Sequence, residues 1–140
     1  MNVASIAGLV HPPMMSAYCA TKAAVIALSE SLRLELAPDR IGVSVVCPSF
    51  FKTNLADSLR SGNPEIARVT HALVERSHTT ADEIANLVFQ GVARGDFHIV
   101  THAEGRLAWR LKRFAPFPLY LRLLARSTRR MMGRGPAPSS

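Results

Sequence analysis

The sequence predicts an α/β fold in which helices alternate with the strands of a parallel sheet. Two observations support this fold class. A helical pattern over Ser16–Ala37 leads into a short apolar run, and a second helical pattern over Ala81–Arg94 leads into another. A helix that returns to a short, buried strand is half of a βαβ unit, and such units build parallel sheets. The 140 residues can form one core, and the 48% hydrophobic content excludes a disordered chain.

The first helix is predicted over Ser16–Ala37. The segment is rich in Ala, Leu, Ser and Glu, and apolar residues recur at helical spacing at Val25, Leu28, Leu32 and Leu36. Pro12 and Pro13 keep the preceding stretch out of a helix, and Pro38 ends the helix. The leucines are expected to lie in the core or on the face of a subunit contact.

The first strand is predicted over Ile41–Cys47, with the sequence I-G-V-S-V-V-C before Pro48. Nearly every residue in this run is apolar, which is typical of a strand buried on both faces. Short helical turns are expected over Pro64–Glu75, after the breaking residues Gly62 and Asn63.

The second helix begins with a capping box. Thr80 can accept a hydrogen bond from the amide of Glu83 while the Glu83 side chain reaches back. The helix over Ala81–Arg94 is predicted to end at Gly95, and a second strand is predicted over Phe97–Thr101. The side chains expected to be buried are Ile84, Leu87, Val88 and Val92.

Tyr18 and Lys22 are the first candidates for chemistry. Positions i and i+4 share one face of a helix, so both side chains can point at one space. A nearby ammonium group favours the phenolate form of a tyrosine, which makes it a workable acid or base. A hydroxyl such as that of Ser5 could hold a substrate oxygen. The alternative is that Tyr18 and Lys22 are an ordinary pair of helix residues.

Four motifs in order resemble the short-chain dehydrogenase/reductase family. N-V-A-S-I-A-G at Asn2–Gly8 resembles the end of its serine strand, and Y-C-A-T-K follows thirteen residues after the serine. V-V-C-P-S-F-F-K-T-N-L at Val45–Leu55 resembles the family's strand, proline turn and threonine. T-A-D-E-I-A resembles the start of its next helix. The resemblance covers residues 1 to about 101 and implies the C-terminal half of a Rossmann-like, doubly wound parallel sheet.

The resemblance implies NAD or NADP as the cofactor and gives individual residues their roles. Tyr18 would exchange a proton with the substrate oxygen and also contact the cofactor, and Ser5 would hold that oxygen. Lys22 would support the tyrosine and bind the nicotinamide ribose. Pro48, Ser49 and Thr53 would contact the nicotinamide carboxamide, although Thr53 can also be read as the cap of a short helix. The substrate would be a small alcohol or carbonyl compound, and the protein a homo-oligomer.

Two features depart from the family's pattern. Ser49 stands where the family usually has glycine. The sequence also contains no glycine-rich strand-turn-helix for a pyrophosphate, and Met1 falls inside an expected central strand. We therefore expect a partial domain over residues 1–103 that binds cofactor poorly by itself, with one edge of its sheet open.

The basic charge gathers in the tail. From Glu104 to Ser140 there are nine Lys and Arg residues and one acidic residue. Residues 104–132 are predicted to form a basic amphipathic helical extension, and residues 133–140 a disordered tail. With Trp109 and Tyr120 at its edges, the extension could lie on an anionic membrane, pack on its own domain or bind a partner. No nucleic-acid motif is present.

The sequence thus leaves two functions open. One is an oxidoreductase of the short-chain type, and the other is a non-catalytic remnant that binds a membrane surface or a partner through its tail. Cys19 and Cys47 lack ligand or disulfide spacing, which favours a reduced, cytoplasmic protein, with membrane association through the tail as an option. No metal site is predicted, and the histidines are interpreted as surface or loop residues: His11, His71, His78, His98 and His102.

Overall fold

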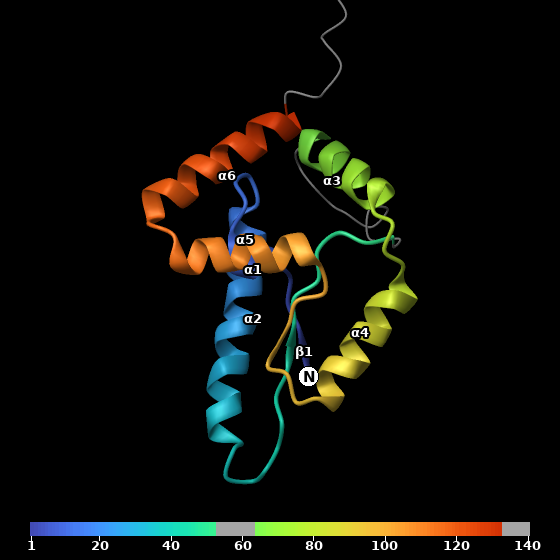
Figure 1. Ribbon diagram of the computed structural model, residues 1–140, viewed down its shortest axis with the longest axis vertical. Helices are drawn as coiled ribbons and strands as arrows, with labels where there is room; N and C mark the ends of the chain where they lie inside the picture. The colour runs from blue at the N-terminus through green and yellow to red at the C-terminus, as the bar shows by residue number, and fades with distance from the viewer. Residues whose placement is uncertain (53–63, 133–140) are drawn as a thin grey trace, which may run out of the picture.

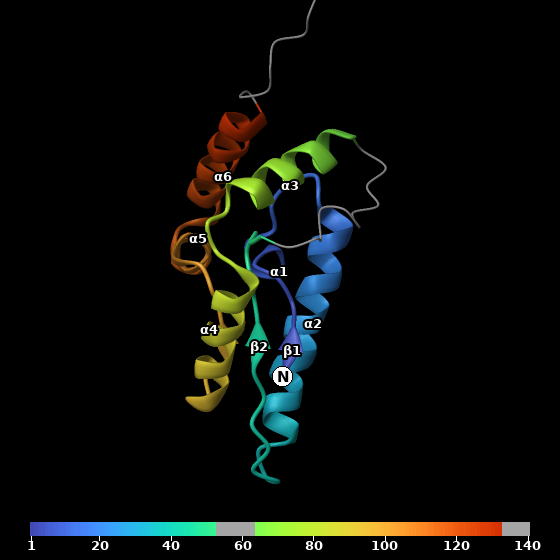
Figure 2. The ribbon, with the colours of Figure 1, turned by 90° about the vertical axis from the view of Figure 1, so that its right-hand side faces the viewer.

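The computed structural model describes residues 1–52 and 64–132, which form a three-stranded parallel sheet in the order β1-β2-β3. The strands are β1 (Asn2–Val3), β2 (Val45–Val46) and β3 (His98–Ile99). Helix α2 (Ser16–Glu35) lies along one face of the sheet and α4 (Ala81–Ala93) along the other (Figures 1 and 2). The predicted class, a part of a doubly wound parallel sheet, is confirmed.

The strands are shorter than the sequence predicted. The backbone hydrogen bonds between the β1 and β2 segments begin where Asn2 N donates to Ser44 O. They end where Ile6 N donates to Pro48 O. Ile41 and Gly42 lie before the paired region and are exposed, so the predicted start of this strand is wrong. The reason is that these residues still belong to the connection from α2, and no strand of the described residues 1–52 and 64–132 pairs with them. Within the described residues, β1 is an edge strand and Val3 is exposed.

The helices begin and end close to their predicted positions. A one-turn helix, α1 (Ala7–Val10), precedes α2, and α3 (Pro64–Arg76) replaces the expected short turns with one continuous helix. The capping box of α4 is present, with Thr80 N donating to Glu83 Oε2 at 2.8 Å and Glu83 N to Thr80 Oγ1 at 3.2 Å. Gly95 follows α4 with φ +74°, a conformation that favours glycine.

The buried face of α4 differs in part from the prediction, whereas in α2 the exposure of Leu28 is compatible with the alternative of a subunit-contact face. α2 buries Cys19, Ile26 and Ser29, whereas Leu28 is exposed. In α4, Ile84 is buried as predicted, but Leu87 and Val92 are exposed. α4 approaches β3 through Gly91, where an added Cβ would lie 2.8 Å from Ile99 Cδ1.

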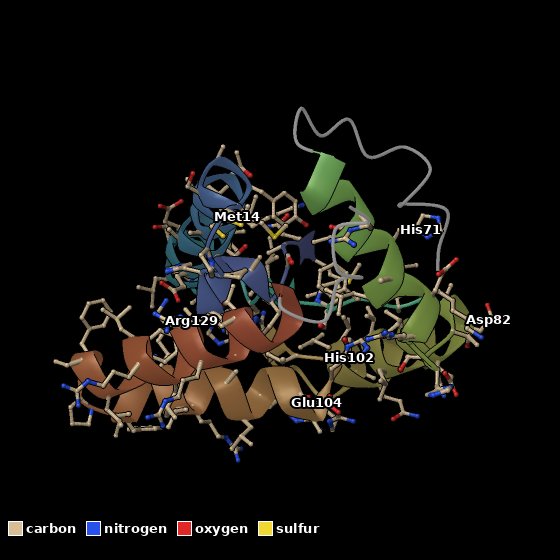
Figure 3. All side chains as sticks on the ribbon, turned by 90° about the horizontal axis from the view of Figure 1, so that it is seen from above. Met14, His71, Asp82, His102, Glu104 and Arg129 are labelled. Carbon is tan, nitrogen blue, oxygen red and sulfur yellow. The ribbon has the colours of Figure 1, made fainter. Side chains whose placement is uncertain are left out.

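The tail forms two helices, α5 (Ala103–Phe114) and α6 (Phe117–Met132), and α6 folds back along α5 (Figures 1 and 3). Tyr120 is buried in the main core cluster, and Trp109 and Leu124 pack against that cluster. Trp109 and Tyr120 therefore pack on the domain itself, which was one of the alternatives left open for the tail. No helix in the described residues is long and apolar enough to cross a bilayer.

Candidate active site

The candidate site lies where the paired strands end at their carboxyl edge. Ala4 N donates to Val46 O at 2.8 Å, and Ile6 N donates to Pro48 O at 2.9 Å. The segment that carries Ser5 therefore runs directly beside the loop that follows β2. Ligands of open α/β sheets bind outside the carboxyl ends of the strands, so this edge is the expected place for a site.

Ser5 is buried at the turn between β1 and α1. Its Oγ accepts a hydrogen bond from Ala7 N at 3.2 Å, and its backbone oxygen accepts one from Gly8 N at 3.0 Å. Because the hydroxyl accepts from the chain, its own proton stays available for another acceptor. The local turn thus fixes a donor at the strand end.

Tyr18 and Lys22 lie one turn apart in α2. The Lys22 ammonium is 5.8 Å from the centroid of the Tyr18 ring, and it donates a long hydrogen bond of 3.5 Å to Val3 O. That carbonyl lies two residues before Ser5. The structure therefore brings Lys22 close to both Tyr18 and the β1 segment that leads to Ser5. Tyr18 itself is exposed at the surface.

Gly8 sets the distance between α1 and the helix that carries the pair. A Cβ at Gly8 would lie 2.7 Å from the backbone carbon of Lys22 and 2.8 Å from its oxygen. Only glycine permits this approach without moving the helix. Asn2 adds a second link between β1 and α2, since its Nδ2 donates to Ser29 Oγ at 3.0 Å. Both contacts hold the chain on either side of Ser5 against α2.

Pro48 and Ser49 lie beside the Ser5 turn, but Thr53 falls outside the described residues. Ser49 N donates to His102 Nδ1 at 3.4 Å, and Thr101 Oγ1 lies 2.8 Å from the same nitrogen. Burial lowers the pKa of His102 below its ordinary value, and the opposing charge of Glu104 has a smaller, raising effect. Half-buried His102 lies in the loop at the N-cap position of α5 (Figure 3), which agrees with its interpretation as a surface or loop residue.

The tail contributes two residues to this region that the sequence did not indicate. Lys112 Nζ donates to Leu9 O at 2.6 Å and lies 2.7 Å from His11 Nδ1. Tyr120 Oη donates to Val10 O. Burial lowers the pKa of Lys112 and raises the pKa of Tyr120. Together they bind the last carbonyls of α1, between Ser5 and Tyr18.

No local sequence signal could have identified this clamp, which we define as Lys112 and Tyr120 on the α1 carbonyls. The two residues lie more than 100 positions from their acceptors, and in sequence they belong to an amphipathic tail. The free carbonyls at the end of every helix are a general signal that some donor is needed. Which donor supplies the bond depends on tertiary packing alone.

A shallow groove of about 450 Å³ lies nearby but does not serve the Tyr18 and Lys22 pair. Its lining is mostly apolar and includes Pro12, Met14, Cys19, Ala20 and Ala23. At 100° per residue, Ala20 and Ala23 are turned well away from Tyr18 around α2. The chemistry-bearing face of α2 is therefore the one toward β1, and the groove lies on another side.

Comparison with known proteins gives consistent matches. Residues 1–64 match a family model described as short chain dehydrogenase. A 3-oxoacyl-acyl-carrier-protein reductase from Rickettsia bellii is 33% identical over 88 residues, covering 63% of this chain and 36% of the relative. Nodulation protein G from Rhizobium sp. is 33% identical over 112 residues, covering 77% of this chain and 44% of the relative. The chain thus spans less than half the length of these relatives.

Solved structures match the described fold. A short chain dehydrogenase/reductase from Burkholderia phymatum in complex with NAD has a TM-score of 0.65 and 28% identity, covering 99% of this chain and 50% of that one. A short-chain dehydrogenase from Sphingobium yanoikuyae in complex with NADPH has a TM-score of 0.56 at 23% identity, covering 99% of this chain and 46% of that one. At that identity the second match bears on the fold alone.

Proposed function

Because the chain belongs to the short-chain dehydrogenase/reductase family, we propose that it carries the acid/base residues of an NAD(P)-dependent oxidoreductase that interconverts an alcohol and a carbonyl. The observation that carries the proposal is the approach of α2 to α1 at Gly8, just after Ser5, with Lys22 between Tyr18 and Val3. An isolated pair one turn apart would be unremarkable. A pair on a helix that packs beside the segment carrying a serine at a strand end is suited to proton transfer.

The three side chains would divide the work on the substrate oxygen. Tyr18 gives a proton to the oxygen when a carbonyl is reduced and takes it back when an alcohol is oxidised. The Lys22 ammonium, 5.8 Å from the ring centroid, would stabilise the negative charge that develops on the tyrosine oxygen during the transfer. Ser5 donates its free hydroxyl proton to the same oxygen, because its Oγ already accepts from Ala7 N.

NAD or NADP would supply the hydride, and the residues of this chain fit its nicotinamide end. Lys22 has donors left for a ribose hydroxyl, since the only bond that it makes to a described residue is the long one to Val3 O. Pro48 and Ser49 are fixed beside Ser5 by the Ile6–Pro48 bond. His102 Nε2, buried beside this loop, has no hydrogen-bond partner among the described residues. These unfilled groups support a polar ligand here; Thr53 remains a candidate.

The remaining assignments follow from the family and from the exposed surface. The substrate is a small alcohol or carbonyl compound, which can be lipophilic, and the reaction is expected in the cytoplasm, where Cys19 and Cys47 stay reduced. A homo-oligomer is expected, and α2 offers a contact face for it, with Leu28 and Leu34 exposed. Nucleic acid is not an expected partner.

Replacement of the tyrosine hydroxyl tests the proposal. In the protein expressed from its own gene, Tyr18→Phe should lower kcat with NAD(P)H and a carbonyl substrate by roughly 10²- to 10⁴-fold. The dissociation constant for NAD(P)H should change by less than about two-fold, because the substitution removes no group of the cofactor site except one hydroxyl. Ser31→Ala, on an exposed part of α2, is the matched control and should leave kcat unchanged. Turnover retained by Tyr18→Phe, or absent from the parent protein, would refute the assignment.

A second candidate function, independent of hydride transfer, is binding of an anionic surface through the tail. The specific observation is that only one side of α5 and α6 packs against the rest of the domain. The rest of their surface exposes Leu107, Phe114 and Phe117 together with several arginines. We define the outer tail face as Leu107, Arg110, Phe114, Arg122, Arg126 and Arg129, together with Phe117, which is exposed at the start of α6 although it lies on the same side of that helix as Leu124. Its test is whether substitutions confined to this face change binding while the fold is kept.

A further inference from the structure

The side of the tail that packs on the domain is already determined by specific contacts. Lys112 and Tyr120 bind the carbonyls of α1, and Trp109 and Leu124 pack against the core cluster. α5 and α6 therefore cannot rotate about their axes without breaking the hydrogen bonds of Lys112 and Tyr120. Whatever lies opposite these four residues is presented permanently to the surroundings.

The bend between the two helices is apolar and strongly exposed. Phe114 is the last residue of α5 and Phe117 is the first residue of α6, and they are 79% and 62% exposed. Leu107, two turns before Phe114 on the same face of α5, is 70% exposed. Figure 1 shows this bend at the edge of the molecule, away from the sheet and from α4. Soluble monomeric proteins rarely gather several large exposed apolar side chains unless the patch binds something.

Positive charge follows the apolar bend along α6. Arg122, Arg126 and Arg129 recur at i, i+4 and i+7 and so share one side of α6, where Figure 3 labels Arg129. Within residues 1–52 and 64–132, no ion pair involves the exposed arginines of the tail, namely Arg110, Arg113, Arg122, Arg126 and Arg129. Their charge is thus not neutralised by the domain itself.

We propose that the outer tail face docks on an anionic lipid bilayer, with Phe114 and Phe117 inserted below the headgroups; this deepens and rests on the second candidate function above. An amphipathic, arginine-rich surface with exposed phenylalanines fits the boundary between headgroups and acyl chains. Each arginine at an anionic leaflet adds roughly a five-fold factor to the partition constant. A second copy of the chain is disfavoured as occupant, because it would bring two uncompensated basic faces together.

Vesicle partition of the full 140-residue chain tests this proposal. Sedimentation with vesicles of phosphatidylcholine containing about a third phosphatidylglycerol should show binding that weakens steeply as salt is raised. Vesicles of phosphatidylcholine alone should bind at least ten-fold less. The double substitution Phe114→Gln with Phe117→Gln should weaken binding on the order of ten-fold, and Arg122→Gln with Arg126→Gln by roughly 25-fold.

Matched variants control for general loss of apolar surface or charge. Phe89→Gln removes an exposed phenylalanine from α4, and Arg40→Gln with Arg76→Gln removes two exposed arginines outside the tail. Both should bind vesicles within about two-fold of the parent. The fluorescence of Trp109, the only tryptophan, should be the same in all variants without lipid, because it reports the packed side of the tail.

Four results would overturn the proposal. Equal binding to neutral vesicles would reject the anionic partner, and unchanged binding of the Phe114/Phe117 variant would reject insertion. If the parent protein does not bind vesicles, and the tail variants instead abolish self-association in sedimentation velocity, the outer tail face is an interface between copies of this chain. If neither vesicle binding nor association state responds, the second candidate function fails as well, whatever the outcome of the Tyr18→Phe assay.

Discussion

Gly8 decides how closely the Ser5 segment approaches the helix that bears Tyr18 and Lys22. Since a Cβ there would lie 2.7 Å from the backbone of Lys22, Gly8→Ala must push α1 away from α2. We expect the free energy of unfolding to fall by roughly 1–3 kcal/mol, as for other overpacked contacts. Urea denaturation measures this loss. The same displacement should lower the kcat of the proposed reaction, because Ser5 moves with α1.

The matched control for this substitution is Gly42→Ala. A Cβ at Gly42 would meet nothing within 4 Å, and its φ does not require glycine. We expect no loss of stability and a gain of up to about 1 kcal/mol, because the unfolded chain loses freedom. Equal losses for both substitutions would show that the Gly8 contact has no special importance.

Cys47 should make stability depend on pH in the alkaline range. Its side chain is fully buried, and burial raises the pKa of its thiol from 9.0 to about 12. A raised native pKa gives stability that is complete below pH 9 and is lost as pH rises toward 12, because only the unfolded thiol ionises there. The contribution of this group should fall by up to about 1.4 kcal/mol per pH unit.

Comparison with Cys47→Ala isolates that contribution. The variant should be less stable overall, since it leaves a small cavity, but its stability should fall less steeply between pH 9 and 11. Denaturant titrations at several pH values give both curves. Parallel curves would mean that the thiol does not titrate differently in the two states.

At the scale of elements, α1 is a single turn whose last carbonyls are bound by two helices distant in sequence, α5 and α6. Four residues cannot sustain a helix by their own hydrogen bonds. α1 therefore depends on Lys112 and Tyr120, and on the left-handed His11 (φ 56°) that ends it. The tail is thus part of the structure that holds the Ser5–Tyr18 segment.

Tyr120→Phe tests that dependence while it keeps the ring buried. Val10 O loses its only side-chain donor among the described residues, so stability should fall by about 1–3 kcal/mol. The His11 amide, which donates to Ala7 O at 3.1 Å, should exchange with solvent at least ten-fold faster. Thr128→Val, which removes another α6 hydroxyl that bonds only within its own helix, should leave His11 exchange unchanged. Equal exchange rates in Tyr120→Phe and the parent would contradict the clamp.

At the scale of the molecule, the tail and the sheet share one core. Ala4 and Val45 of the strand region, Ile26 of α2 and Tyr120 of α6 belong to the same buried cluster. Residue 103 separates a nearly neutral segment from a basic one. The two segments nevertheless share one core and do not pack as separate units. Functional tests of the tail should therefore use substitutions on its outer side rather than deletions.

A chain that ends at residue 103 should be severely destabilised. It loses Tyr120 and the half-buried Trp109 from the core and leaves the α1 carbonyls without donors. These losses amount to about 5 kcal/mol, which is comparable to the net stability of a small domain. Thermal unfolding followed by circular dichroism should show a midpoint lowered by more than about 10 °C, or no cooperative transition. A midpoint within about 2 °C of the full chain would show that the tail is dispensable.

The sequence by itself determined the order and type of the elements and the candidate chemistry. Local signals sufficed for the Thr80 capping box, for the helix that begins at Ser16 and for the strand before Pro48, since caps, periodicity and proline act within a few residues. The i, i+4 spacing of Tyr18 and Lys22 likewise needs only one helix. Only the tertiary structure decided which faces are buried and what binds α1. Gly91 lets α4 approach β3, Gly8 lets α1 approach α2, and Tyr120 forms a hydrogen bond to Val10, 110 residues earlier in the chain. These features could not be predicted, because close approaches and long-range hydrogen bonds leave no periodic pattern in a sequence.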